Sequence, residues 1–94
     1  MRALIWALQA EADLYDIADT YSQVAPALDQ ELLDRIFDAP LILRDYPFLG
    51  EEVGAFALRK WLVRRTPFIL LYRVTDDFIE IARVVPAASD WRDA

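Results

Sequence analysis

Two runs of apolar side chains in the second half of the chain give the clearest structural pattern. Residues Phe68 to Val74 and Phe78 to Val85 consist largely of Phe, Ile, Leu, Tyr and Val, which suit a pleated and partly buried surface. Between them lie Thr75, Asp76 and Asp77. Asp is typical of tight turns because it tolerates turn dihedrals and can bond its own backbone. The pattern predicts a β-hairpin.

The turn fixes a register for this hairpin. With Asp76 and Asp77 as the loop pair, Arg73 faces Glu80, and opposite charges across a ladder contribute about 0.2–1 kcal/mol. One face then carries Phe68, Leu70, Tyr72, Ile79, Ile81 and Val85, and the other carries Ile69, Leu71, Ala82 and Val84. Because both faces are apolar, each one needs cover.

The first half of the chain changes from a strand pattern to a helical one. Residues Ala3 to Ala7 read as a short strand. From Ala10 to Val24 the apolar positions recur with a helical period, and a second helix is expected from Pro26 through Ala39. The short break at Ala25-Pro26 between two helices of similar length predicts an antiparallel helical hairpin.

The remaining residues complete an α+β domain. A loop is expected at Asp45 to Gly50, because of its Pro and Gly, and a further strand at Ala55 to Val63. The order β-α-α-β-β-β then predicts a single domain over residues 1–94, with the two-helix hairpin packed on one face of an antiparallel sheet. Little is left to cover the face of Ile69 and Leu71, and a bare apolar face usually marks a partner surface.

Composition narrows the chemistry available to the chain. The 94 residues contain no cysteine and no histidine, which excludes disulfides, thiolate metal sites and Ser-His or Cys-His nucleophilic catalysis within the chain. We expect no metal and no cofactor. No apolar run approaches the roughly 20 residues of a membrane span. The run from Ala3 to Leu8 is shorter than the roughly 7–15 residues of a signal-peptide core, so a cytoplasmic location is expected.

Charge is unevenly distributed along the chain. The net charge is −6, and all of this excess lies in residues 1–50, whereas residues 51–94 are balanced. A protein that grips nucleic acid usually has an overall basic footprint, so direct nucleic-acid binding is not expected. The second half still contains a local basic cluster, made of Arg59, Lys60, Arg64 and Arg65.

For several charged and aromatic side chains, a structural role is the alternative to a functional one. Helical spacing puts Asp13, Asp16, Asp19 and Asp34 on solvated faces, so neither a catalytic carboxylate pair nor a cation site is expected. Trp6 and Trp61 are expected in the core or at its rim.

The order of elements and a set of short motifs resemble the RelE/ParE superfamily of bacterial toxins from type II toxin–antitoxin systems. The resemblance covers Leu4 to Trp91. It rests on Ala12-Asp13-Leu14 with Ile17, Leu43 followed by Pro47-x-x-Gly50, Arg59, Pro67 to Val74, Ile79-x-Ile81-x-Arg83-Val84 and Asp90-Trp91. It implies a cytoplasmic toxin that is neutralised by a cognate antitoxin, whose flexible segment folds across the toxin.

Two activities occur in this superfamily. RelE-like members cut messenger RNA on the ribosome with basic side chains on the sheet and a Tyr or His near the C-terminus, whereas ParE-like members poison DNA gyrase. Here Ile69 stands where the RelE-like members carry Arg, the last strand ends in Val85-Pro86, and no Tyr follows Tyr72. Arg83 before Val84 is more similar to ParE. The resemblance therefore favours a gyrase-directed toxin with a ParD-like antitoxin; a RelE-like endonuclease and a degenerate, non-toxic antitoxin-binding module are the alternatives.

The candidate partner-binding residues combine basic and apolar side chains. Arg59 and Arg83 could contact gyrase or an acidic antitoxin segment, or each could pair with a local carboxylate such as Glu80. Trp91 could anchor an interface or fold back onto the sheet. The full set is Arg59, Arg64, Arg65, Ile69, Leu71, Arg83, Val84 and Trp91.

Overall fold

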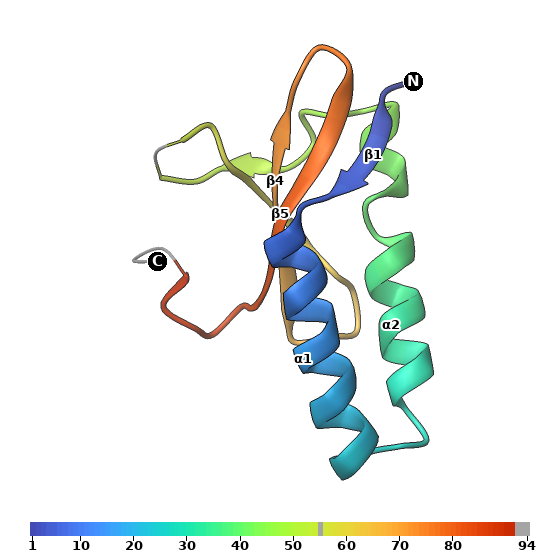
Figure 1. Ribbon diagram of the computed structural model, residues 1–94. Helices are drawn as coiled ribbons and strands as arrows, with labels where there is room; N and C mark the ends of the chain where they lie inside the picture. Colours follow the sequence, from blue (N-terminus) through green and yellow to red (C-terminus); the bar gives the residue numbers. More distant parts are fainter. Residues whose placement is uncertain (55, 92–94) are drawn as a thin grey trace.

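A computed structural model of the chain describes residues 1–54 and 56–91 (Figure 1). Its elements are β1 (Ala3–Trp6), α1 (Leu8–Val24), α2 (Asp29–Asp38), the short 3-10 helix η1 (Leu41–Arg44), β2 (Glu51–Glu52), β3 (Arg59–Leu62), β4 (Phe68–Val74) and β5 (Phe78–Pro86). The strands form one sheet in the order β1-β5-β4-β3-β2. The predicted α+β fold with its two-helix hairpin is confirmed.

The sheet differs from the prediction at its two edges. β1 lies parallel to β5, whereas β2, β3, β4 and β5 pair in an antiparallel manner, so the sheet is mixed. Nothing local to β1 specifies its direction, because its partner strand comes more than seventy residues later. Of the strand expected over Ala55 to Val63, Ala55 lies outside the described residues, and β3 covers only Arg59–Leu62. The short strand β2, which precedes it in the chain, pairs with β3 and was not predicted.

The helices begin and end near the predicted positions. α2 begins at Asp29 rather than at Pro26, and Asp29 and Glu31 in its first turn suit the positive end of the helix dipole. It ends at Asp38, shortly before Pro40, which cannot continue the helical hydrogen bonds. No helix in the described ranges is long and apolar enough to cross a membrane.

The main core lies between the helical hairpin and the sheet. α1 and α2 contribute Ala10, Leu14, Ile17, Leu32 and Ile36, and the strands contribute Phe68, Leu70, Tyr72, Ile79, Ile81 and Val84. Trp6 and Trp61 are partly buried against this core, as predicted. Figure 1 shows α1 crossing in front of β5, with α2 beside it.

The hairpin of β4 and β5 has the predicted register near its turn. Arg73 faces Glu80, and their side chains form an ion pair of 2.9 Å. Farther along, the register shifts between Leu71 and Tyr72: Tyr72 faces Ile81 and Leu71 faces Arg83, so Ala82 is the extra residue of a β-bulge. Because side chains alternate along a strand, one extra residue exchanges the two faces of β5 beyond it.

This bulge corrects the predicted faces of β5. Val84 lies opposite Leu70 and packs in the main core, whereas Val85 lies opposite Ile69 on the other face of the sheet. The assignment of Val84 to the face of Ile69 and Leu71 is therefore wrong. The reason is the bulge, which no residue of the sequence marks.

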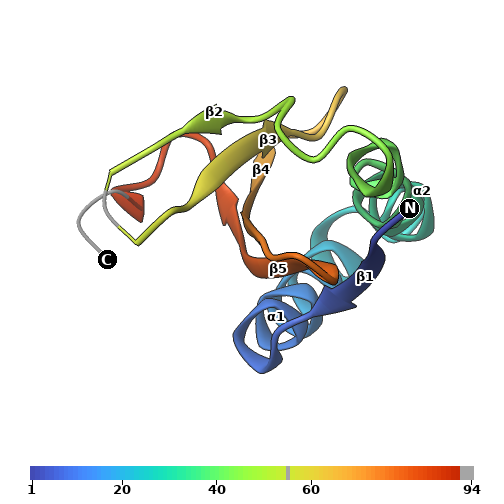
Figure 2. The same ribbon diagram turned by 90° about the horizontal axis from the view of Figure 1, so that it is seen from above.

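The expectation that the second face of the sheet is bare is also wrong. Ile69 and Leu71 are only 5% and 4% exposed, and they form a small second cluster with Val53 and Val85. Leu58 and Trp91 pack against this cluster. Figure 2 shows why: the β2–β3 loop and the segment after β5 both lie on the side of the sheet away from the helices. The chain shields this face itself.

Candidate functional site

The candidate site is built on β3, the turn after it, and β5. In chain order, its polar side chains are Arg59, Arg64, Arg65 and Arg83. The contacts of each one decide whether it is free to meet a partner.

Arg83 is tied to the first helix. Its Nε and Nη2 donate to the two carboxylate oxygens of Asp13 at 2.8 and 3.1 Å, and the backbone N–H of Val84 donates to Asp13 Oδ2 at 2.9 Å. Asp13 is only 8% exposed. Its placement on a solvated helix face is therefore a wrong prediction, because its partners come from a strand 70 positions later. The hydrogen bond to Asp13 raises the pKa of Arg83.

The Asp13–Arg83 contact has the geometry of a structural anchor. A guanidinium that donates two parallel hydrogen bonds to one carboxylate makes a charge-assisted pair of fixed orientation. The third hydrogen bond, from the Val84 backbone, satisfies the carboxylate further. This anchor fixes α1 against β5 beside the bulge. Glu80, considered as a partner for Arg83 from the sequence, pairs with Arg73 instead.

Arg59 is occupied by the loop that precedes β2. Its Nη1 donates to the Gly50 carbonyl at 2.6 Å, and its Nη2 contacts Glu52 Oε1 at 3.1 Å. The guanidinium also lies 5.0 Å from the centroid of the Phe48 ring, which is a favourable cation–π distance. The predicted local carboxylate partner exists, and it is Glu52.

Tyr72 holds the same loop from the core side. Its hydroxyl donates to the Pro47 carbonyl at 2.8 Å and accepts a hydrogen bond from the Gly50 N–H at 2.8 Å. Burial raises the pKa of this hydroxyl. A Cβ atom on Gly50 would lie 2.5 Å from the Tyr72 hydroxyl and 2.6 Å from the Lys60 carbonyl, so this close approach requires glycine. The Pro47-x-x-Gly50 motif is thus explained by a buried tyrosine.

The turn between β3 and β4 is different, because its cations point to solvent. Arg64 and Arg65 are exposed, and within residues 1–54 and 56–91 neither forms an ion pair or a side-chain hydrogen bond. They border a depression of about 510 Å³ that also includes Arg35, Asp38, Trp61 and the exposed Leu62. Trp61 is fixed there by donating its indole N–H to the Ala39 carbonyl at 2.8 Å. We call Leu62, Arg64 and Arg65 the basic turn.

The structure therefore separates the predicted partner-binding residues into three groups. Arg64 and Arg65 are accessible in the basic turn, and Arg59 and Arg83 are engaged by Glu52 and Asp13. The apolar residues Ile69, Leu71 and Val84 are buried, and Trp91 packs on the second cluster. The sequence analysis did not predict the polar contacts of Asp13 and Tyr72. Both residues lie in motifs that carry the family resemblance, Ala12-Asp13-Leu14 and Pro67 to Val74, but hydrophobic periodicity alone does not reveal a buried polar partner.

The described residues contain no group of three or more carboxylates that could hold a metal ion. What they offer is a binding surface of exposed cations beside apolar side chains. Such a surface fits an acidic segment with apolar residues, which can pair with the arginines and cover Leu62.

A family model described as "ParE toxin of type II toxin-antitoxin system, parDE" matches residues 4–91. A curated relative, "Toxin RelE2" of Caulobacter vibrioides, is 34% identical over 88 residues, which cover 94% of this chain and 98% of that protein.

Two solved structures are similar in fold. A chain from the "Chromosomal ParDE TA system from P. aeruginosa" has a TM-score of 0.81 and 26% identity, covering 92% of this chain and 96% of that chain. A chain of the toxin–antitoxin complex RelBE2 from Mycobacterium tuberculosis has a TM-score of 0.58 and 20% identity, covering 90% and 96% respectively. The second likeness is one of fold alone.

Proposed function

This chain belongs to the ParE toxin family of type II toxin–antitoxin systems, and we propose that it acts in the cytoplasm on DNA gyrase and is neutralised by a cognate antitoxin. The resemblance to the RelE/ParE superfamily is thereby confirmed. Of the two solved structures compared, the ParDE chain has the higher TM-score, which supports a ParD-like antitoxin as the partner.

One observation carries the choice of gyrase over messenger RNA. The side chains that could take part in phosphodiester cleavage on this sheet are already occupied within the fold: Arg83 by Asp13, Arg59 by Gly50 and Glu52, and the Tyr72 hydroxyl by Pro47 and Gly50. A general acid or base must reach the proton that it transfers. These groups are better suited to hold the fold, and a toxin that acts by binding needs no others.

The antitoxin contact is proposed at the basic turn and the adjoining second cluster. Within the described residues Arg64 and Arg65 form no ion pair, and Leu62, the last residue of β3, is exposed beside them. The second cluster lies under a thin cover made by Leu58 and Trp91. An antitoxin segment with carboxylates and apolar side chains can pair with the turn and replace or extend this cover.

Gyrase supercoiling in the presence of the purified chain tests the proposed target. We expect relaxed plasmid to remain relaxed at a molar excess of the chain, and supercoiling to return when the antitoxin encoded by the neighbouring gene is added. A parallel translation reaction, analysed for cleaved messages, tests the alternative function of a RelE-like endonuclease. Normal supercoiling together with message cleavage would replace gyrase with the ribosome; normal supercoiling with intact messages and antitoxin binding would indicate a degenerate module.

The partner surface is tested by charge reversal. Arg64→Glu is expected to weaken antitoxin binding about tenfold or more, because a favourable charge contact becomes repulsive. Arg44→Glu is the control, since Arg44 is part-exposed on η1, away from the basic turn, and its Nε donates to the Leu41 carbonyl of the same turn. If both variants bind the antitoxin equally well, the basic turn is not part of the interface. This outcome would not bear on the proposed gyrase target, which the supercoiling assay tests separately.

A further inference from the structure

Two depressions adjoin the outer edge of β3, one on each side of the sheet. The first, of about 510 Å³, is the one that the basic turn borders, and it reaches the end of α2 at Asp38 and the exposed Ile42. The second, of about 530 Å³, lies on the face of Ile69 and is also lined by Leu49. The two depressions have three residues in common: Trp61, Leu62 and Arg64. Together they form one surface that continues around the edge of the sheet.

The edge between the two depressions is open. Within residues 1–54 and 56–91, β2 is the only strand outside β3, and it pairs with Arg59 and Lys60 alone. The chain leaves the sheet before β2 at Gly50, whose N–H donates to the Tyr72 hydroxyl. Leu62, at the end of β3, is 59% exposed. A partner segment can therefore cross the edge over Leu62 without displacing a strand.

Apolar side chains are exposed on both sides of this edge. On the second face, Leu58 and Trp91 cover the second cluster but do not line the depression, which has Ile69 and the half-exposed Leu49 among its lining residues. On the helix side, Ile42 is also half-exposed. Exposed apolar side chains that gather around one continuous surface mark an interaction site. Each depression can accept an apolar side chain of a partner.

The charges of the lining residues are largely neutralised within the fold. Lys60 in the second depression pairs with Glu51 at 3.2 Å, and Arg35 in the first pairs with Glu31. Three lining residues form no ion pair within the described part of the chain: Arg64, Arg65 and Asp38. Two cations against one carboxylate leave an excess of one positive charge, and Arg64 is the cation that both depressions share. The surface therefore suits an apolar segment with a carboxylate near its middle.

We propose that a single antitoxin segment crosses the edge of β3, with one apolar side chain in each depression and a carboxylate beside Arg64. The inference rests on the proposed antitoxin partner and adds the path of its chain, from the second face of the sheet over Leu62 to the end of α2. Because the two apolar side chains belong to one segment, binding of the first raises the effective concentration of the second.

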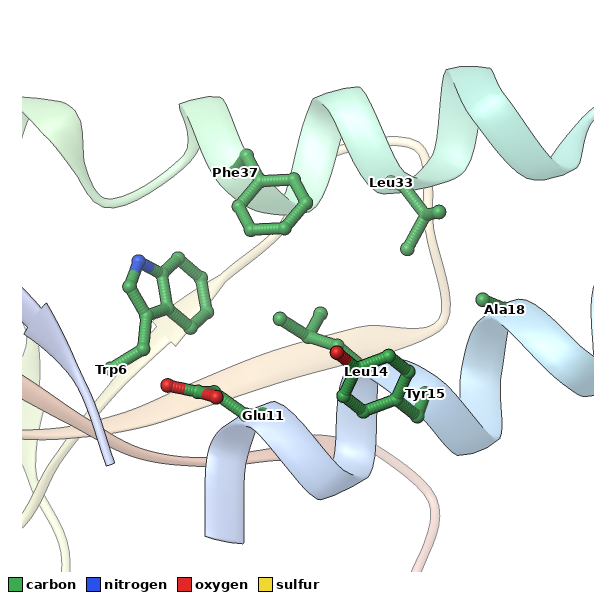
Figure 3. A pocket seen from close by; sticks show the side chains of 7 residues that line it. All are labelled: Trp6, Glu11, Leu14, Tyr15, Ala18, Leu33 and Phe37. Atoms are coloured by element: carbon green, nitrogen blue, oxygen red, sulfur yellow. The ribbon is translucent and has the colours of Figure 1, made fainter. Parts of the chain in front are cut away.

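The helical hairpin offers a different depression, which lacks these features. It has a volume of about 370 Å³, and Leu33 and Phe37 of α2 point toward α1 across it (Figure 3). Among its described lining residues Glu11 is the one charged side chain, and it would repel the carboxylate of the proposed segment. Tyr15, which lines it, is 75% exposed and provides a control position away from β3.

A second copy of the chain fits the edge less well than an acidic segment. Two copies docked edge to edge would bring Arg64 and Arg65 against the same cations, and like charges across an interface are costly. The occupant that matches the surface is therefore the antitoxin.

Binding of the labelled antitoxin from the neighbouring gene to four variants of the full chain tests this path. Leu49→Asn and Ile42→Asn each remove an apolar wall from one depression, and each is expected to weaken binding about tenfold. Leu62→Asn affects both depressions and is expected to weaken binding about a hundredfold. Tyr15→Asn should bind like the wild type. All four side chains are exposed, so the variants should fold, which circular dichroism verifies.

The pattern of losses separates the outcomes. Weaker binding by both Leu49→Asn and Ile42→Asn supports a segment that crosses the edge, whereas a loss confined to one of them, or to neither, would overturn the path. A loss for Tyr15→Asn would place the segment on the helices and overturn it as well. Wild-type dimers that Leu62→Asn dissociates would assign the edge to a second copy. If the wild type itself does not bind the antitoxin, the proposed partner fails together with its path.

Discussion

The two faces of the sheet are covered in different ways. On one face, two helices bury a continuous core and a buried carboxylate, Asp13, joins the first helix to the last strand. On the other, a loop and the chain end place Leu58 and Trp91 over Ile69 and Leu71. The first face has a thick, polar-anchored cover, and the second has a thin apolar one. We infer that the first face holds the fold and that the second can exchange its cover for a partner.

A large effect is expected from removing the anchor on the helix-covered face. Asp13→Ala leaves the Val84 N–H and the Arg83 guanidinium without their carboxylate; breaking a fully buried pair costs about 3–5 kcal/mol, and the lower end is expected here because the Arg83 side chain is 36% exposed and water can solvate it. Asp16→Ala, an exposed acid on the same helix, should change the free energy of unfolding by no more than about 0.5 kcal/mol. Urea denaturation of both variants measures the difference, and similar midpoints would show that the anchor is dispensable.

Leu70 and Leu71 test the comparison of the faces most evenly, because they are neighbours that point to opposite sides of β4. Leu70→Ala opens a cavity in the thick core and is expected to cost near the upper end of about 2–5 kcal/mol. Leu71→Ala lies under the thin cover, which can collapse into the space, so its cost is expected near the lower end. Thermal or urea unfolding compares them. A larger loss for Leu71→Ala would reverse the assignment of the stabilising face.

The contribution of the Tyr72 hydroxyl to the free energy of unfolding is expected to depend on pH. Tyr72→Phe leaves the Gly50 N–H and the Pro47 carbonyl unsatisfied, which is expected to cost about 1–3 kcal/mol at neutral pH. Burial raises the pKa of this hydroxyl above its ordinary value of 10.0, so the unfolded chain ionises first as pH rises. The stabilisation is therefore complete below about pH 10 and is lost as the pH passes through the folded pKa.

The free energies of unfolding of wild type and Tyr72→Phe should therefore converge at alkaline pH. The free-energy difference between them, measured by urea denaturation across the alkaline range, isolates this hydroxyl from the other tyrosines and the lysine. A difference that stays constant above pH 10 would mean that the hydroxyl is not held in its protonated form by the fold.

The ion pair between Arg73 and Glu80 has the smallest expected effect. Both side chains are partly exposed, so water and salt screen their attraction. Glu80→Gln is expected to lower the free energy of unfolding by about 0.2–1 kcal/mol, less in high salt. A double-mutant cycle with Arg73→Gln measures the coupling directly; a coupling of several kcal/mol would show that the pair does more than fix the register.

The sequence was sufficient where the determining contacts are local. The β4–β5 turn, its Arg73–Glu80 register and the two helices follow from turn residues, cross-strand charge and helical period. The bulge at Ala82 was not predictable, because alanine carries no mark of an extra residue. It moved Val84 from the second face to the main core.

Long-range contacts account for the other differences. The direction of β1, the burial of Asp13 and the cover over Ile69 each depend on residues far along the chain. For the candidate site, the exposed Arg64 and Arg65 could be predicted from their place at a turn. The occupied state of Arg59 and Arg83 could only be seen once their partners Glu52 and Asp13 were placed in space.

Hydrogen–deuterium exchange of the chain, alone and bound to the antitoxin, tests most directly whether the thinly covered face is the one that meets its partner. We expect the antitoxin to slow exchange at the basic turn and at the strand carrying Ile69 and Leu71, while the amides of α1 exchange as before. Slowed exchange confined to α1 and α2, with the basic turn unchanged, would contradict the division of the molecule into a stabilising face and a binding face.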